Sequence, residues 1–375
     1  MFTNAAFFFF LFCIAIQLGF VLYFFIRIFT PPEKKLNYAP DQPVSVIICA
    51  KNEAENLKAN LPSILAQRYT NEAGNTHFEV VVADDASTDN TQEVLRELQK
   101  SYRNLKVVTI GTGEERKLPG KKHALSRAVA EAKHDIFLMT DADCVPATAI
   151  WIKKMIRPFK DGKEVVAGYG KYETEDSLLN SFTRWETVHT FLQLSTYARA
   201  GVPYMAVGRN LACTRAAFEK AQNSPQWAKL PSGDDDLLIN AAAAKDNVAV
   251  VTSAKAFTTT TAKADWLSWA RQKQRHLSTG KYYRFRVKTL LAKYGFSHAF
   301  VWLAFFVLLF TPFWGEAIAI MMMRSLTYWT LWQRAACILR EKKLVRFFPL
   351  FDFGWLIYNF AFLQYIIWKN KQQWT

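Results

Sequence analysis

The stretch Ile136-Phe137-Leu138-Met139-Thr140-Asp141-Ala142-Asp143 joins a buried-strand pattern to a pair of acids. Open α/β sheets bind ligands at the carboxyl ends of their strands, which is where Asp141 and Asp143 fall. Two carboxylates so close on extended backbone can share one hard divalent cation, and that cation can neutralise a substrate diphosphate. An Asp-x-Asp pair that only caps a turn is the alternative, so the neighbouring motifs must decide between the two.

The chain on either side of this stretch alternates between strand and helix patterns. Aliphatic and β-branched runs predict strands over 44–49, 78–83, 105–110 and 135–140. Helices are predicted over 52–67, with Asn52 as N-cap and Glu55 completing a capping box, from the cap residues 87–89 to about 100, and over 121–133. Alternation at this spacing indicates an α/β domain with a mostly parallel sheet, which we place at 43–281.

Composition narrows the class of protein. The 375 residues carry a net charge of +15, yet 51% of them are hydrophobic. A basic chain this apolar is typical of proteins that meet an anionic membrane surface or a phosphate-bearing substrate. Nucleic-acid binding is disfavoured because no zinc-finger spacing or RNA-binding aromatic signature accompanies the charge. The five cysteines form no C-x-x-C pair, which favours a reducing compartment over a disulfide scaffold or a zinc site.

Hydrophobic residues concentrate at the two ends of the chain. Residues 5–26 carry no charge and can cross a bilayer, so we expect a transmembrane anchor over 1–30 rather than a cleaved signal peptide. Arg27, Lys34 and Lys35 follow this segment, which places the next domain in the cytoplasm. Apolar stretches at 299–323 and 347–368, with a short span or interfacial helix at 325–339, predict C-terminal transmembrane or interfacial helices over 297–370. We therefore expect an integral protein of a bacterial-type inner membrane.

Two further motifs fit the ligand edge of the predicted sheet. Asp84 and Asp85 end the second strand, where a carboxylate can accept a hydrogen bond from a nucleobase N–H or can cap the following helix. Lys121 follows a glycine-rich stretch at a helix start, where backbone N–H groups suit a phosphate. A solvated lysine is the alternative for Lys121.

Three consecutive acids, Asp234-Asp235-Asp236, precede a Leu-Leu pair. Such a run raises the pKa of its members unless a cation lies nearby, and a raised pKa suits a general base. An acidic first turn favoured by the helix dipole is the alternative interpretation.

The ordered motifs resemble those of glycosyltransferase family 2, whose members are inverting enzymes with the GT-A (Rossmann-like) fold. The resemblance spans about 43–281. It is carried by residues 44–53 (VSVIICAKNE), 84–91 (DDASTDNT), 120–125 (GKKHAL), 141–143 (DAD), 232–238 (SGDDDLL) and 272–276 (QKQRH). Each motif alone is common, whereas the ordered set is specific.

This resemblance implies a role for each site residue. Asp235 would be the general base with Asp234 beside it, whereas alignment on Leu237 in place of Leu238 would shift the role to Asp236. Asp141 and Asp143 would hold Mg²⁺ or Mn²⁺. His276 stands where the family has Trp. The donor nucleotide would be bound by Ala50, Asn52, Glu53, Asp84, Asp85, Lys121, Asp141, Gln272, Arg275 and His276.

The predicted function is that of a membrane-bound inverting glycosyltransferase. It would move a sugar from a nucleotide sugar, expected to be UDP-linked, to a hydroxyl of a lipid or lipid-linked acceptor. A processive polysaccharide synthase is one alternative, disfavoured because few spans are available for a channel. A non-catalytic membrane scaffold or transporter that retains a nucleotide-binding fold is another, and the intact set of acids argues against it. Nucleic acid is not an expected partner.

Overall fold

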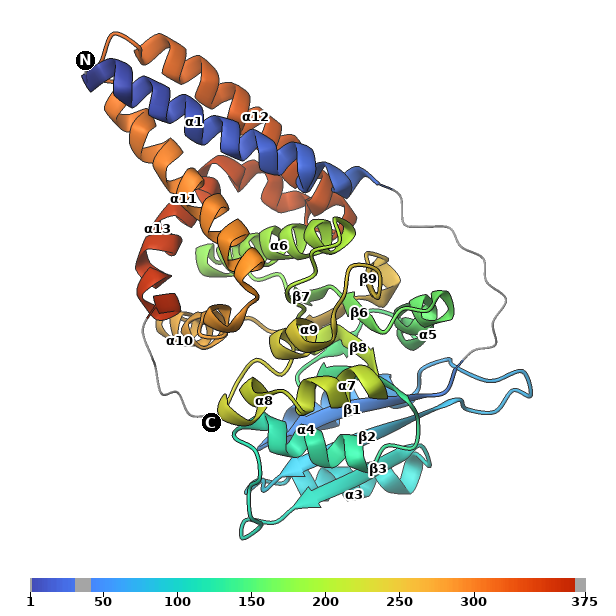
Figure 1. Cartoon of the computed structure of the whole chain (residues 1–375). Coiled ribbons are helices and arrows are strands. Elements are labelled where there is room, and N and C mark those ends of the chain that lie inside the picture. Colours follow the sequence, from blue (N-terminus) through green and yellow to red (C-terminus); the bar gives the residue numbers. More distant parts are fainter. Residues whose placement is uncertain (1, 31–41, 368–375) are drawn as a thin grey trace.

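The computed structural model describes residues 2–30 and 42–367 and is built around a seven-stranded sheet (Figure 1). The strand order is β3-β2-β1-β4-β8-β6-β9. The parallel strands predicted from sequence pair around β1, and β8 runs antiparallel between β4 and β6. The bounds are β1 Val44–Ala50, β2 Phe78–Asp85, β3 Leu105–Ile110, β4 Ile136–Asp141, β6 Val165–Gly168, β8 Leu211–Thr214 and β9 Val248–Val251. The predicted α/β class is confirmed, while the antiparallel strand was not foreseen.

Helices cover both faces of this sheet. Successive side chains of each strand point to opposite faces and are apolar on both, so each face needs a layer of helices to bury it. Val46 and Ile48 of β1 belong to one core and Ile47 to the other. The first face is packed by α2 Ala54–Leu65, α3 Thr91–Ser101 and α5 Trp151–Ile156. The second face is packed by α4 Lys121–Ala130, α6 Leu178–Arg199, α7 Arg215–Gln222, α8 Pro225–Lys229 and α9 Asp236–Ala242.

A smaller sheet and several short helical turns complete the α/β part. The three strands are ordered β5-β10-β7, with bounds β5 Val145–Pro146, β10 Thr258–Thr260 and β7 Gly170–Tyr172. The turns are η2 Arg157–Asp161, η3 Gly208–Asn210 and η4 Ala254–Ala256. Because β5 follows directly on the acids that end β4, this small sheet lies beside the predicted ligand edge.

The first helix, α1, and the last helices, α11 to α13, form one helical bundle (Figure 1). Within it α1 packs along α11, and α6 lies between the bundle and the large sheet. Two stretches, Phe2–Phe29 and Phe285–Leu308, are long and apolar enough to cross a membrane. The elements are α1 Phe2–Tyr23, η1 Phe25–Phe29, α10 Trp266–Leu277, η5 Gly280–Tyr282, α11 Phe285–Leu308, α12 Trp314–Ile338, η6 Lys342–Phe347 and α13 Phe348–Ile367.

The C-terminal helices differ from the predicted apolar stretches in their bounds. The stretch predicted over 299–323 is divided between α11 and α12, because the chain turns at residues 309–313 around Pro312. The short helix expected over 325–339 is the second half of α12. Lys34, Lys35 and the end of the segment predicted at 347–368 lie outside the described residues.

Polar side chains tie four helices together inside the bundle. The Asp352 carboxylate of α13 accepts a hydrogen bond from Arg324 of α12 at 2.6 Å and lies 3.2 Å from the His298 ring of α11. Gln17 of α1 donates to the Ser297 hydroxyl of α11 at 2.8 Å. All five side chains are buried. We name Gln17, His298, Arg324 and Asp352 the bundle cluster.

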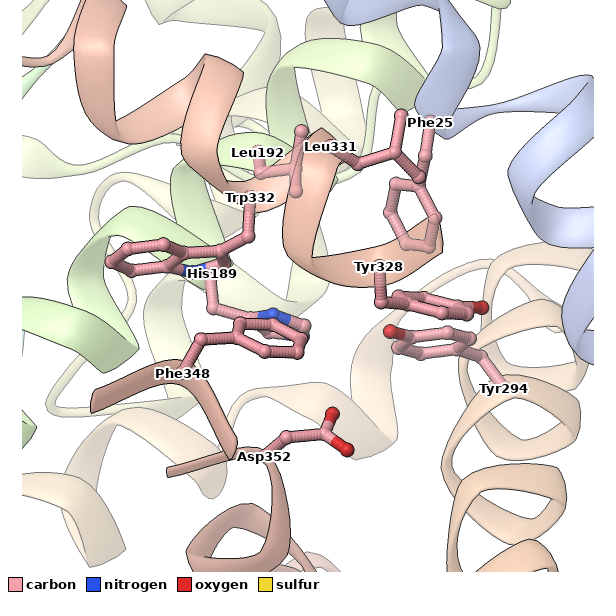
Figure 2. A pocket seen from close by; sticks show the side chains of 9 residues that line it. All are labelled: Phe25, His189, Leu192, Tyr294, Tyr328, Leu331, Trp332, Phe348 and Asp352. Carbon is pink, nitrogen blue, oxygen red and sulfur yellow. The ribbon is translucent and has the colours of Figure 1, made fainter. Parts of the chain in front are cut away.

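A cavity of about 10 Å³ lies where the bundle meets α6, which is about the room that one water needs. Figure 2 shows the rings of Tyr294 and Tyr328 lying next to each other along one side of it, with His189 and Phe348 opposite. Its remaining lining residues are Phe25, Leu192, Leu331, Trp332 and Asp352. The junction is therefore closely packed and mostly aromatic.

Two ion pairs stabilise this junction between the bundle and α6. Buried Glu341, just before η6, pairs with Arg184 of α6 and lies 3.5 Å from Lys171 of β7. On the other side, Lys273 of α10 pairs with Glu186 of α6. Each carboxylate joins elements from distant parts of the sequence, so the bundle and the α/β part share one packed interior.

Candidate active site

The predicted site residues gather at one edge of the large sheet because their strands end in register. Ala50, the last residue of β1, lies opposite Asp84 of β2. On its other side, Cys49 of β1 lies opposite Asp141 of β4. Carboxyl ends of parallel strands meet at the same edge. The base-contacting acids and the metal-binding acids predicted from sequence are thereby brought next to each other.

The loops after β1 and β2 are locked together in a strained backbone. Asn52 and Ala86 both have φ of 56, a left-handed conformation that side chains other than glycine rarely adopt. The Asn52 N–H donates to the Ser87 hydroxyl at 2.9 Å, and its side-chain oxygen accepts from the Thr88 N–H at 2.8 Å. Such strain persists only where the surroundings over-determine it, as they do at this edge.

The prediction that Asn52 caps α2 is wrong. Glu53 occupies the N-cap position without a side-chain cap bond, and the first N–H of the helix, that of Ala54, donates to Asp89 at 3.2 Å. Asp89 also accepts from the Thr91 N–H at 3.0 Å, so one carboxylate serves the starts of two helices. Asn52 is consequently left with its side chain committed to the loop after β2.

Asp84 and Asp85 are both fully buried at the end of β2. One oxygen of Asp84 accepts from the Ser87 N–H at 3.2 Å, and one oxygen of Asp85 pairs with Arg116. The second oxygen of each carboxylate is buried without a hydrogen-bond partner among the described residues. A buried carboxylate oxygen left unpaired is costly, and a ligand N–H would remove that cost.

The acids at the end of β4 offer a place for a hard cation. Ligand atoms of Asp141, Asp143 and Cys144 lie within 4.8 Å of one another, and Asp143 is exposed. One oxygen of Asp143 accepts from the Thr260 hydroxyl of β10 at 2.8 Å, which fixes its orientation. Burial raises the pKa of the Cys144 thiol well above its usual range, so the thiol stays protonated. The two carboxylates that remain suit Mg²⁺ or Mn²⁺ better than a thiolate metal.

Glu53 faces the same acids from the loop after β1. Burial raises the pKa of its carboxyl, and the charges of Asp143 and Asp141 add to that shift although the Asn56 amide, 2.6 Å away, opposes it. A bound cation would relieve this crowding of negative charge.

Lys121 connects the β4 acids with the acidic run that was predicted to be catalytic. Its ammonium pairs with Asp141 and lies 3.8 Å from Asp234. Burial alone would lower the pKa of Lys121, but Asp141 and Asp234 together raise it well above its usual range. Gly120 allows this placement, because it has φ of +61 and a Cβ there would lie 2.4 Å from the Pro231 carbonyl oxygen.

The neighbouring Lys122 has a different role. Its ammonium is buried and donates to the carbonyl oxygens of Trp227 at 3.2 Å and Leu230 at 2.9 Å. Burial lowers the pKa of Lys122 to about 8. Lys122 therefore holds the segment before the acidic run in place, and Lys121 is the lysine that faces the site.

Within the acidic run, Asp235 and Asp236 are held in different ways. One oxygen of Asp235 accepts from the Gly208 N–H and the other from the Asp236 N–H, both at 2.8 Å. Burial, reinforced by Asp234, raises the pKa of Asp235 to about 6. Asp236 is buried and accepts from the hydroxyls of Thr279 and Tyr283, each at 2.7 Å. Asp236 is thus bound within the fold, whereas Asp235 remains partly exposed.

Helix α10 carries the remaining predicted residues to the side of this cluster. The positive charges of Arg209 and Arg275 act on Asp141 and, after Lys121, help to lower its pKa against the effect of burial. Gln272 is partly buried and His276 exposed, and neither hydrogen-bonds to these acids among the described residues. Trp269 packs against Phe362 of α13 and Lys273 pairs with Glu186 of α6, so both side chains serve the contact with these helices.

Several residues that build the site were not singled out from the sequence. Thr260 orients Asp143, Arg116 pairs with Asp85, and Tyr283 holds Asp236. The threonine-rich strand at 258–260 was a detectable β signal, but nothing local indicates that it lies beside the β4 acids. Arg209 lies in η3, just before β8. It stacks over Tyr172 and donates to the Gly170 carbonyl at 2.7 Å.

Comparison with known proteins gives short matches to glycosyltransferases. A dolichol-phosphate mannosyltransferase from Pyrococcus furiosus is 35% identical over 125 residues, which cover 33% of this chain and 32% of that protein. A β-monoglucosyldiacylglycerol synthase from Synechocystis is 35% identical over 104 residues, covering 28% of this chain and 20% of that protein. The matched segments thus span about a third or less of these relatives' length.

Structural likeness extends over nearly the whole chain. The mannosyltransferase PcManGT from Pyrobaculum calidifontis, solved in complex with GDP-Man and Mn²⁺, aligns with a TM-score of 0.55 at 18% identity. The alignment covers 94% of this chain and 99% of that one, and at this identity it speaks for the GT-A fold alone. Residues 45–220 match the family model for glycosyl transferase family 2. The chain therefore contains, over residues 45–220, a domain similar to glycosyl transferase family 2.

Proposed function

We propose that this protein is a membrane-bound inverting glycosyltransferase that moves a sugar from a nucleotide sugar to a hydroxyl of a lipid or lipid-linked acceptor. The observation that carries the proposal is Asp235, a partly exposed carboxylate whose pKa is raised to about 6. Its neighbour Asp234 shares Lys121 with Asp141. A general base that is ionised at neutral pH therefore lies next to the sheet edge where a diphosphate could bind.

The chemistry proposed for these residues is a single displacement. The Asp235 carboxylate takes the proton of the acceptor hydroxyl as that oxygen forms a bond to the anomeric carbon. The bond from that carbon to the diphosphate oxygen breaks on the opposite face, so the configuration inverts. Lys121 and Arg275 place positive charge where the leaving diphosphate gains negative charge. Asp234 keeps the pKa of Asp235 raised, which strengthens the base without preventing its ionisation at neutral pH.

Asp141 and Asp143 would hold the Mg²⁺ or Mn²⁺ ion that the family implies. When bound, the metal supplies a Lewis acid that stabilises the leaving diphosphate. The protein's own contribution is to orient Asp143 through Thr260 and to keep Asp141 ionised through Lys121.

The proposed donor is a UDP-sugar, bound at the edge formed by β1 and β2. The unpaired oxygens of Asp84 and Asp85 offer acceptors for a base N–H. Uracil and guanine both present such a donor. The relatives named for dolichol-phosphate and diacylglycerol products support a lipid acceptor.

The proposed location is an inner membrane with the catalytic site on the cytoplasmic side. Support comes from two stretches of sufficient length and apolarity and from Arg27, which lies in η1 at the end of the first stretch. A direct test uses single cysteines at positions 4 and 100 in a Cys337→Ser background, since the other cysteines are buried. In intact cells, an impermeant thiol reagent should label Asn4→Cys and not Lys100→Cys. The opposite labelling would contradict the proposed orientation.

The experiment that tests the proposed activity is a donor screen with the purified full-length protein. UDP- and GDP-linked sugars are each incubated with a lipid extract and Mn²⁺, and the products are separated by mass spectrometry. We expect one donor to yield a glycolipid with a single added sugar and inverted configuration. Polymeric product would instead indicate a synthase. Nucleotide binding with neither transfer nor hydrolysis for every donor would contradict an enzymatic role.

A further inference from the structure

A basic groove opens on the surface between α12 and η6, away from the candidate active site. It has a volume of about 660 Å³ and is lined by Trp329, Lys342, Lys343, Val345 and Arg346. The three cationic side chains are exposed. None of them pairs with a carboxylate among the described residues. A hollow of this size is large enough for a small ligand rather than only for solvent.

The acid next to this groove does not neutralise it. Glu341 directly precedes Lys342, yet its side chain is buried and occupied by Arg184 and Lys171 on the inner side. The turn thus directs its one acid inward and its cations outward. The groove keeps a net positive charge, which favours an anionic ligand.

The groove lies at the level where α12 changes from apolar to polar. Met322, Met323 and Leu326 are 60%, 63% and 57% exposed on the side toward the start of the helix. Gln333 and Arg334, further along, are exposed and polar. Trp329 falls between these two groups, and it stacks against Phe348 of α13. Tryptophan between an apolar band and cationic residues is typical of the interface between bilayer and water.

We infer that this groove binds the headgroup phosphate of an anionic phospholipid of the surrounding bilayer. The ammonium and guanidinium groups would bind the phosphate oxygens, and Trp329 and Val345 would contact the first carbons of the lipid. The inference rests on the membrane location under the proposed function and not on the sugar-transfer chemistry. A phospholipid is favoured over a free phosphate because the groove is partly apolar and adjoins the apolar band of α12.

The test compares lipid preference in two charge-matched variants of the full chain. Lys342→Gln/Lys343→Gln/Arg346→Gln removes the cations of the groove. Lys58→Gln/Lys153→Gln/Arg96→Gln removes the same charge from exposed positions on α2, α5 and α3. Each protein is placed in phosphatidylcholine nanodiscs with rising phosphatidylglycerol, and the thermal midpoint is recorded. A shared midpoint in pure phosphatidylcholine shows that all three chains fold.

The wild type and the surface control should gain stability at the same phosphatidylglycerol content. The groove variant should have about 100-fold weaker affinity for phosphatidylglycerol and so gain little stability even at the highest content, because each cation near a membrane surface contributes on the order of a fivefold effect. Added salt should weaken the response, since the cations are exposed. If the groove variant misfolds, Lys343→Gln alone, with a smaller expected loss, replaces it.

An equal response of the groove variant and the wild type would overturn the inference, as would an equal loss in the surface control. A response to inorganic phosphate alone, without anionic lipid, would show that the ligand is not a phospholipid. Sugar transfer measured in pure phosphatidylcholine separates this failure from failure of the proposed function. Transfer that persists without any phosphatidylglycerol preference would refute only the lipid site.

Discussion

Two clusters of ionisable side chains in the molecule are built in opposite ways. At the sheet edge, Lys121 serves both Asp141 and Asp234, and the side chains of these three residues are 21%, 38% and 22% exposed. In the bundle cluster, one carboxylate, Asp352, serves both Arg324 and His298, and these side chains are 8%, 2% and 1% exposed.

This difference distinguishes a cluster suited to binding a ligand from a cluster that serves the structure. The sheet-edge cluster has more acids than cations and an open side, so a cation or a phosphate–metal complex can complete it. The bundle cluster has its one acid paired inside a closed interior, where the adjoining cavity has room for about one water, and it joins helices instead. Perturbed ionisable groups in a cleft point to function, whereas buried balanced pairs more often serve structure.

The largest effect is expected when Asp235 is replaced by Asn, because the substitution keeps the size of the side chain and removes its basicity. Turnover should fall by about 10²–10⁴-fold, while the affinity for the nucleotide stays nearly unchanged. Steady-state kinetics and equilibrium titration with the nucleotide measure the two quantities.

Asp236→Asn is the matched control. An amide oxygen can still accept from Thr279 and Tyr283, so near wild-type turnover is expected. An inactive Asp236→Asn alongside an active Asp235→Asn would move the base by one residue. If both variants were active, the acidic run would be only a helix start.

Substitutions in the bundle cluster are expected to lower the stability of the protein and to leave the chemistry at the sheet edge unchanged. Asp352→Ala leaves Arg324 buried without its counter-ion, so the free energy of unfolding should fall by about 3–5 kcal/mol. Thermal denaturation in detergent measures this loss. The double variant Arg324→Met/Asp352→Leu should recover much of it, because an apolar pair needs no counter-charge. A double variant less stable than Asp352→Ala would mean that the ion pair itself is required.

A smaller effect is expected when Thr260 is substituted, because its hydroxyl contributes to the sheet edge by orienting Asp143. Thr260→Val keeps the shape of the strand and removes the hydroxyl, so Mn²⁺ affinity should weaken about 10–100-fold with the fold unchanged. Nucleotide binding titrated against Mn²⁺ after EDTA treatment reports this directly. Asp143→Asn should abolish the rescue by Mn²⁺ altogether, and metal-independent nucleotide binding in the wild type would refute the metal site.

The smallest effect is a shift in pH dependence. Asp235 acts as a base only when ionised, and its pKa is raised to about 6. Turnover should therefore be complete above that pH and fall as the pH drops through it. Because Asp234 contributes to the raised pKa, Asp234→Asn should move this acid limb to lower pH. An acid limb that does not move would show that burial alone sets the pKa.

The strands and their acidic ends could be predicted because they are local patterns. Val44–Ala50 and Ile136–Asp141 are apolar runs whose ends are marked by polar residues. The N-cap prediction at Asn52 failed because Asp89, far along the chain, supplies the cap. Likewise β8 enters the sheet antiparallel through long-range pairing, which a strand of only four residues does not specify.

Charges inside the helical region were harder to interpret from sequence. Hydropathy is averaged over one segment of the sequence at a time. It therefore cannot predict that Arg324 and Asp352, which lie on two different helices, form a pair. Glu341 stands in a charged run that is typical of an exposed loop, yet it is fully buried. Its partners in α6 and β7 become apparent only when the chain is folded.

The placement of Glu341 has a consequence for how the protein is made. The acid stands 157 residues after its partner Arg184. A chain that is still being synthesised therefore completes α6 and the whole acidic run before the counter-ion of Arg184 has left the ribosome. Until then, Arg184 of α6 lacks its partner Glu341, and the apolar face of α6 is not yet covered by the C-terminal helices. The packed interior that joins α6 to the bundle is therefore complete only after η6 and α13 have been synthesised.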